Sequence, residues 1–134
     1  MRDADEIIRA LDLAPHPEGG WFREIHRDPY STAIYFLLKQ GEVSHWHRIG
    51  QSEAWHYYAG AAVELLLSRS GTRIERHVLG PDLTQGERPL LVVPPRCWQA
   101  AKSLGAWGLA GCTVAPPFAF DGFELAPKDW EPGG

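Results

Sequence analysis

The sequence predicts an all-β protein, a sandwich or barrel of many short strands, with one short helix at the N-terminus. Glycine and proline, 14 and 11 of the 134 residues, punctuate nearly every segment, which argues against a helix-rich fold. The stretches between them are short and mostly rich in β-branched, aromatic and other apolar residues. Short strands at regular spacing with turn residues between them are typical of sandwiches and barrels.

The one expected helix covers residues 3–11. Ile7, Ile8 and Leu11 recur at helical spacing, and acidic residues stand at the positive N-terminal end of the segment. Pro15 and Pro17 follow and are expected to end it.

The expected strands follow in order, and turn residues separate them. The strand at residues 32–38 is the richest in β-formers and is expected to be buried on both faces. Residues 62–68 and 72–79 flank "RSG" and predict a hairpin. Residues 44–49 and 53–59 could be two strands or one bent strand, with "GQS" as the bend. The predicted strands are residues 21–27, 32–38, 44–49, 53–59, 62–68, 72–79, 90–94, 97–103 and 107–115.

Length and composition narrow the class of protein. A chain of 134 residues predicts a single domain, residues 1–134, with a hydrophobic core. The net charge of −4 and the scattered basic residues argue against a nucleic-acid partner. No apolar run approaches the roughly 20 residues of a membrane helix, and the charged N-terminus lacks the apolar core of a signal peptide. We therefore expect a cytoplasmic protein without a membrane partner, and Cys97 and Cys112 as small buried hydrophobes.

The stretch "SHWHRIGQSEAWHYYAG" concentrates residues that can bind metals. His45 and His47, two apart on a strand, are expected to point to the same face about 7 Å apart. Glu53 would complete a His/His/carboxylate set suited to Mn, Fe, Ni or Zn. Strand histidines are also often solvated or hydrogen-bonded, so a metal site and an aromatic-lined pocket both remain open.

The spacing of Gly41, His45, His47, Glu53 and Gly60 resembles the first motif of the cupins. The gap between the second histidine and the glutamate is five residues, where three or four is usual. The second cupin motif is matched by its proline but departs from the pattern afterwards. There Arg96 stands in the glycine position, Gln99 in the position of the metal-binding histidine and Ser103 in that of the asparagine.

The likeness extends over nearly the whole chain. The segments "PHPEGGWFRE", "TAIYFLL", "SHWHR", "EAWHYYAG", "LGPDL", "GERP", "VPPRCWQAA" and "GCTVAP" together resemble the cupin_5 family, small cupins of unassigned function. The resemblance implies a jelly-roll barrel, a homodimer and a small-molecule pocket inside the barrel, but no particular reaction. It makes His45, His47, Glu53 and Gln99 the expected ligands of a divalent metal. A carboxamide oxygen binds such metals more weakly than imidazole does.

Strand alternation indicates which side chains face the pocket. Cys97, Gln99 and Ala101 share one face of their strand, and Trp98 lies on the other. A second strand places Glu53, Trp55 and Tyr57 on one face and His56 and Tyr58 on the opposite one, unless a bulge reverses them. Tyr35 lies in an apolar strand and needs a hydrogen-bond partner if buried.

Residues 15–24, "PHPEGGWFRE", form the other polar concentration. They predict either a surface loop or a lid over the barrel mouth, with Arg23 as a fork for a carboxylate or phosphate. Gly19 and Gly20 allow unusual backbone angles there. The candidate ligand-binding residues are Glu18, Trp21, Arg23, Trp55 and Gln99.

Three functions remain open from the sequence. The first is a metal-dependent enzyme in which the ion polarises a substrate oxygen. The second is a metal-free isomerase or epimerase on a sugar-like substrate, similar to the sugar-nucleotide 3,5-epimerases of the same barrel type. It would use His47 or His56 as base and Tyr35 or Tyr57 as acid. The third is a non-catalytic binding module for a small molecule.

Overall fold

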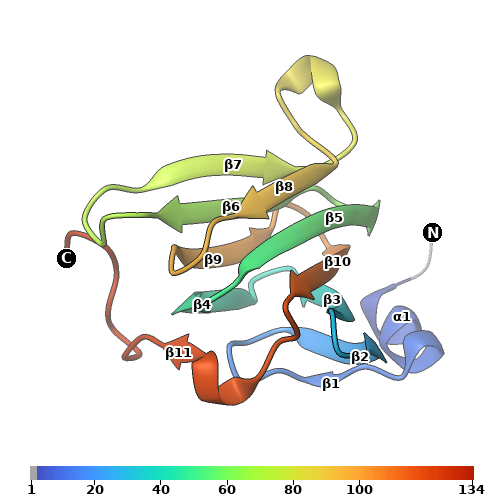
Figure 1. Cartoon of the computed structure of the whole chain (residues 1–134). Helices are drawn as coiled ribbons and strands as arrows, with labels where there is room; N and C mark the ends of the chain where they lie inside the picture. The colour runs from blue at the N-terminus through green and yellow to red at the C-terminus, as the bar shows by residue number, and fades with distance from the viewer. Residues whose placement is uncertain (1–2) are drawn as a thin grey trace.

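Two antiparallel sheets face each other and enclose the core, as the computed structural model shows for residues 3–134 (Figure 1). One sheet has the order β1-β2-β3-β10-β5-β8 and the other β11-β4-β9-β6-β7. The strands of the first sheet are β1 (Ala14–Pro15), β2 (Trp21–Arg27), β3 (Thr32–Lys39), β10 (Trp107–Ala115), β5 (Ser52–Gly60) and β8 (Leu90–Val93). Those of the second are β11 (Glu124–Leu125), β4 (Val43–Arg48), β9 (Trp98–Ser103), β6 (Val63–Ser68) and β7 (Glu75–Leu79). This two-sheet jelly roll confirms the predicted fold class.

Helix α1 (Ala4–Leu11) lies where the sequence predicts it. Asp3 caps it by accepting a hydrogen bond from the Glu6 N–H at 2.8 Å. The helix ends before either proline, because Asp12 adopts a left-handed conformation with φ of 55°. Its apolar side packs on the outer face of the first sheet, on a cluster that includes Leu37 and Trp107.

The main core lies between the sheets, where Phe36, Leu38 and Trp55 from one sheet meet residues such as Leu65 and Leu67 from the other. β3 is therefore buried on both faces, as predicted, since Leu37 points outward under the helix. Cys97 and Cys112 are buried free thiols in the core, also as predicted.

The sequence left open whether residues 44–59 form two strands or one bent strand. They form two strands, β4 and β5, in different sheets. β4 and β5 belong to opposite sheets, so Ile49, Gly50 and Gln51 carry the chain across. β6 and β7 form the predicted hairpin. The long connection between β7 and β8 contains the short helix η1 (Leu83–Gln85) and projects away from both sheets (Figure 1, yellow).

The segment after β10 closes one end of the molecule. It forms the short helix η2 (Phe120–Gly122) and then β11, which pairs with β4. Figure 1 shows this segment in orange-red at the lower left, beside β1 and β2. Within residues 3–134, no helix is long and apolar enough to cross a membrane.

Candidate active site

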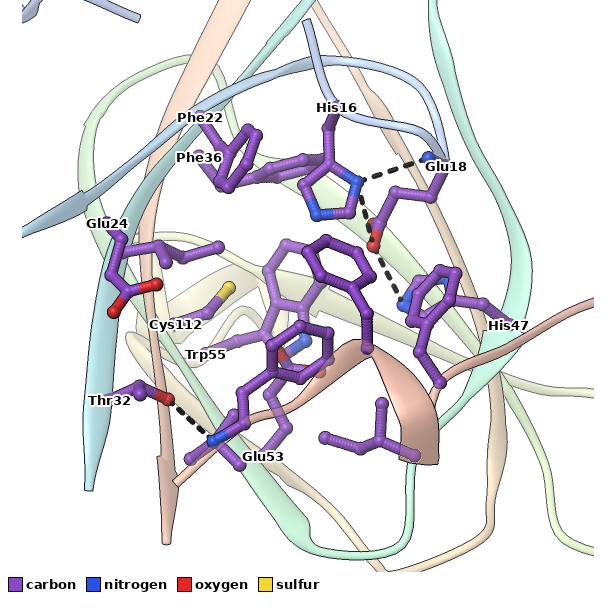
Figure 2. A pocket seen from close by; sticks show the side chains of 16 residues that line it. His16, Glu18, Phe22, Glu24, Thr32, Phe36, His47, Glu53, Trp55 and Cys112 are labelled. Carbon is purple, nitrogen blue, oxygen red and sulfur yellow. Dashed lines mark hydrogen bonds and ion pairs between the residues drawn. The ribbon is translucent and has the colours of Figure 1, made fainter. Parts of the chain in front are cut away.

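A cavity of about 50 Å³ lies inside the barrel (Figure 2). Most of its wall is aromatic or aliphatic, and a few ionisable side chains project into it. The apolar lining consists of Phe22, Ile34, Phe36, Ile49, Trp55, Val114, Phe118, Phe120 and Phe123. The polar and thiol lining consists of His16, Glu18, Glu24, Thr32, His47, Glu53 and Cys112. Such a wall suits a small organic molecule that is oriented by a few polar groups.

His47 enters the cavity from β4 and has only 2% of its surface exposed. Its Nδ1 lies 2.7 Å from the His45 carbonyl oxygen. A carbonyl oxygen can only accept, so Nδ1 carries the hydrogen and Nε2 carries a lone pair in the neutral ring. Burial lowers the pKa of His47, which favours that neutral form.

Glu18 reaches the cavity from the loop between β1 and β2. Gly19 adopts a φ of +107°, and a Cβ there would lie 2.1 Å from the Val43 carbonyl oxygen. Only glycine therefore lets this loop lie against β4. The loop is fixed there by the His45 N–H, which donates to the Glu18 carbonyl oxygen at 2.7 Å. The segment that the sequence left open as a surface loop or a lid thus forms part of the cavity wall.

His16, in the same loop, has the opposite neutral tautomer. Its Nδ1 accepts a hydrogen bond from the Glu18 backbone N–H at 3.1 Å, so the hydrogen of the neutral ring is on Nε2. Burial and the nearby His47 lower the pKa of His16 to about 4, and the ring is neutral at pH 7.

The Glu18 carboxyl lies between these two rings (Figure 2). Its Oε1 is 3.4 Å from His16 Nδ1 and 3.4 Å from His47 Nε2. Both nitrogens are lone-pair acceptors, so an ionised Oε1 would face two lone pairs. A protonated Oε1 can donate to His47 Nε2, whereas the single lone pair of His16 Nδ1 already accepts the Glu18 backbone N–H. Burial raises the pKa of Glu18 to about 8, although a hydrogen bond from the Ser44 hydroxyl opposes the shift. The contacts of Glu18 with His16 and His47 have the distances of ion pairs, but they join neutral groups at pH 7.

Glu53 forms a second buried carboxyl, held by Gln99. The Trp55 indole N–H donates to Gln99 Oε1 at 2.9 Å, and Gln99 Nε2 donates to Glu53 Oε1 at 2.8 Å. An indole can only donate, so it fixes which end of the amide faces Glu53. Burial raises the pKa of Glu53 to about 7, whereas His47 opposes that shift and Glu18 adds to it.

The four predicted metal ligands do not assemble around one point. Pairing between β4 and β9 shifts register between Ser44 and His47, which turns His45 out of the cavity. His45 Nε2 lies 2.9 Å from the Pro127 carbonyl oxygen instead. The amide oxygen of Gln99 accepts the Trp55 N–H and is not free for a cation.

The expectation that His45 and His47 project together is therefore wrong. Among residues 3–134, no group of three or more histidine, cysteine, aspartate or glutamate side chains is arranged to hold a metal ion. The residues present thus do not fit the divalent ion that the motif implies.

Alternation along β5 and β9 is confirmed. Glu53 and Trp55 line the cavity, and Tyr57 packs against the main core. Cys97 and Ala101 belong to the main core and Gln99 is fully buried beside it, whereas Trp98 packs in a separate cluster.

Several other candidates lie away from the cavity. His56 contacts the Thr113 hydroxyl at 3.0 Å and the Tyr57 hydroxyl donates to the Gly60 carbonyl at 2.7 Å. Tyr35 packs in the cluster beneath α1. The structure thus does not place these candidate catalytic residues at the site.

Two of the proposed ligand-binding residues also lie elsewhere. The Trp21 indole N–H donates to Glu42, and the half-exposed Arg23 lies 3.7 Å from Asp12. Glu18 and Trp55 line the cavity, and Gln99 is hydrogen-bonded to Trp55 without lining it.

Sequence reasoning missed the aromatic wall after β10 and the contribution of His16. Phe118, Phe120 and Phe123 all line the cavity. Three phenylalanines within six residues of a turn-rich segment were the available signal. For His16 the sequence offers only its place in a charged loop.

Comparison with known proteins agrees with this architecture. A family model described as "Cupin superfamily (DUF985)" matches residues 5–126. The chain belongs to the Cupin_5 family. A solved structure of a Shewanella oneidensis protein is 38% identical, with a TM-score of 0.89, over 94% of this chain and 85% of that one. A hypothetical protein from Leishmania major is 26% identical, with a TM-score of 0.87, over 93% of this chain and 88% of that one.

More distant cupins share the fold alone. Bacillus subtilis oxalate decarboxylase is 13% identical with a TM-score of 0.68, and the match covers 84% of this Cupin_5 chain but only 29% of the decarboxylase. That decarboxylase has Mn(II) centres. Comparison with proteins of curated function gave no match.

Proposed function

We propose that this Cupin_5 protein is a metal-independent acid–base enzyme that shifts a proton on a small carbonyl compound, an isomerase or epimerase. The observation that carries the proposal is the Glu18 carboxyl between two imidazole lone pairs in an apolar cavity. A neutral acid and a neutral base side by side are what such chemistry needs at neutral pH.

The roles follow from the assigned protons. His47 Nε2 removes a proton from the carbon beside the carbonyl, and the electrons of that C–H bond form a carbon–carbon double bond. The carbonyl π electrons move to oxygen, which takes the proton from Glu18 Oε1. The products of this step are an enol, an imidazolium and a carboxylate, and the two charged groups are 3.4 Å apart. Their attraction stabilises this state in a low-dielectric cavity.

For isomerisation of a 2-hydroxy carbonyl compound, the imidazolium returns its proton to the former carbonyl carbon, and the neighbouring hydroxyl becomes the new carbonyl as its proton goes to the Glu18 carboxylate. For epimerisation, a second acid returns a proton to the other face of the same carbon, the enol proton goes back to the Glu18 carboxylate, and the imidazolium proton re-protonates the second acid. The apolar wall excludes water from the enol. Glu53, oriented by Gln99, is the second buried carboxyl available for this return.

The test is exchange of carbon-bound hydrogen in D₂O, because it needs no net reaction. The protein is incubated with a panel of small aldehydes, ketones, 2-oxo acids and short sugars, and loss of the α-proton signal is followed by NMR. We expect exchange that falls by about 10²–10⁴-fold in His47→Gln, since a general base contributes that factor. Glu18→Gln should also slow it, and the wild-type rate should fall above the Glu18 pKa of about 8.

His45→Gln is the matched control, because His45 lies on the same strand but outside the cavity. It should exchange like the wild type. If no compound exchanges faster with the wild type than with His47→Gln, the proposal is wrong. Binding in the cavity without exchange would identify a non-catalytic binding module instead.

A further inference from the structure

A surface groove lies next to the cavity. It is lined by Arg48, Ile49, Gly50, Arg96, Gly122 and Glu124. Ile49 also lines the cavity, so this groove and the cavity share a wall. The groove carries two arginines and one glutamate, which gives it a net positive charge.

Arg96 holds an unfavourable backbone conformation at this place. Its φ is +61°, a region that residues with a Cβ rarely adopt. It is the third residue of the turn Pro94–Cys97, in which the Cys97 N–H donates to the Pro94 carbonyl at 3.3 Å. A positive φ at that position normally selects glycine or asparagine. Strained residues of this kind concentrate at functional sites.

The Arg96 turn is also fixed in place. Its N–H donates to the Ile49 carbonyl oxygen at 2.8 Å, which anchors the turn to the wall shared with the cavity. The Arg96 side chain is exposed, and within residues 3–134 its guanidinium has no hydrogen bond or ion pair. No contact of this side chain with residues 3–134 therefore accounts for an arginine here in place of a less strained residue.

The Arg48 side chain, which also lines the groove, is fixed by two contacts. Its guanidinium lies 4.3 Å from the centre of the Trp98 ring, and its Nε donates to Glu124 at 2.8 Å. One of its five N–H groups is used by that bond, which leaves four for a ligand. A stacked and paired arginine loses little side-chain freedom when it binds.

We propose that this groove is an oxyanion subsite, in which Arg48 and Arg96 bind a carboxylate or a phosphate group. Forked guanidinium groups match the paired oxygens of both anions. The shared Ile49 places a bound anion at the edge of the cavity. The subsite stands on its own contacts and does not depend on the proposed proton transfer.

The experiment is an NMR titration of the ¹⁵N-labelled protein at low ionic strength, with inorganic phosphate in one arm and acetate in the other. We expect saturable shifts of the Gly50, Arg96 and Gly122 amides. The tighter of the two anions then identifies the ligand class as phosphate or carboxylate.

Arg96→Gly is the decisive variant. It removes the guanidinium and places at φ +61° a residue that adopts this conformation without strain. We expect affinity for the anion to fall at least tenfold while the melting temperature stays the same or rises. Arg96→Asn provides a second variant that tolerates the same backbone.

Arg73→Ala is the matched control, because Arg73 lies in another groove with two arginines and a glutamate. It should bind the anions like the wild type. Unchanged affinity in both Arg96 variants, shifts confined to the groove of Arg73, or no saturable binding of either anion would overturn the proposal.

Discussion

Gln99 has no exposed surface, and its amide joins two other side chains of the barrel interior. Its oxygen accepts from Trp55 and its nitrogen donates to Glu53. Removing the amide would leave an indole N–H and a carboxyl oxygen without partners inside the protein. Buried polar groups that lose their partners each destabilise a fold by about 1–3 kcal/mol.

We therefore predict that Gln99→Leu lowers the free energy of unfolding by about 2–4 kcal/mol. Urea denaturation at pH 7 measures it. Gln85→Leu, in the exposed connection between β7 and β8, is the control and should change stability by less than about 0.5 kcal/mol. Equal effects of the two substitutions would show that the Gln99 bonds contribute nothing.

Strand β4 shows how far an element can be predicted from sequence. Its existence follows from the residue pattern, as do the alternating faces of β5 and β9, whereas the predicted bounds, residues 44–49, are shifted by one residue toward the C-terminus from the observed Val43–Arg48. The register shift between Ser44 and His47 could not be seen, because it depends on pairing with a strand about 50 residues away. Because of this one irregularity, His47 lines the cavity and His45 does not, so the predicted set of four metal ligands does not form.

The site was predicted in part for the same reason. Glu53, Trp55 and Gln99 lie where strand alternation placed them. The pairing of Glu18 with His16 and His47 depends on a loop that folds back against β4, and no periodicity in the sequence encodes that contact. The proton positions required the hydrogen-bond partners of both rings.

The C-terminal segment is held as an element by an aromatic cluster. The centre of the Trp130 ring lies 4.7 Å from that of the Trp98 ring and 6.3 Å from that of the Trp46 ring. The Ala126 N–H donates a hydrogen bond to the Trp46 carbonyl oxygen at 3.0 Å. The same segment carries the phenylalanines that close the cavity. Anchoring by Trp130 therefore keeps the cavity wall in place.

We predict that Trp130→Ala destabilises the protein by about 1–3 kcal/mol and speeds hydrogen exchange of the Ala126 amide. Exchange measured residue by residue by NMR checks both the size and the location of the effect. Tyr30→Ala, at a side chain that is 78% exposed, is the control. Protection of Ala126 that is identical in both variants would contradict the anchoring role.

At the scale of the whole molecule, enclosing ionisable groups between two sheets makes stability depend on pH. Glu18 has a folded pKa of about 8 against an ordinary value of 4.5. Its stabilising contribution is complete below pH 4.5 and is lost as the pH rises through 8. Glu53, with a pKa of about 7, acts in the same direction over a narrower range. His16 acts oppositely, since its pKa of about 4 means that stability falls as pH drops below 6.5.

We predict that Glu18→Gln matches the wild type in stability at pH 4, where the carboxyl is protonated in both the folded and the unfolded chain and an amide resembles it. At pH 8.5 the variant should be more stable by a few kcal/mol, as each pKa unit is worth about 1.4 kcal/mol. Urea denaturation across this pH range measures the difference, with Glu131→Gln at an exposed site as the control. A difference that stays constant with pH would mean that Glu18 is ionised throughout.

The proposed chemistry depends on the proton positions around Glu18, and ¹⁵N NMR of the histidine rings can determine them. At pH 7, without any ligand, we predict two neutral rings of opposite tautomer, with hydrogen on Nδ1 in His47 and on Nε2 in His16. Glu18→Gln should leave both tautomers unchanged. An imidazolium signal for His47 at pH 7 that disappears in Glu18→Gln would instead show an ion pair with an ionised Glu18, and the neutral acid–base pair would then be wrong.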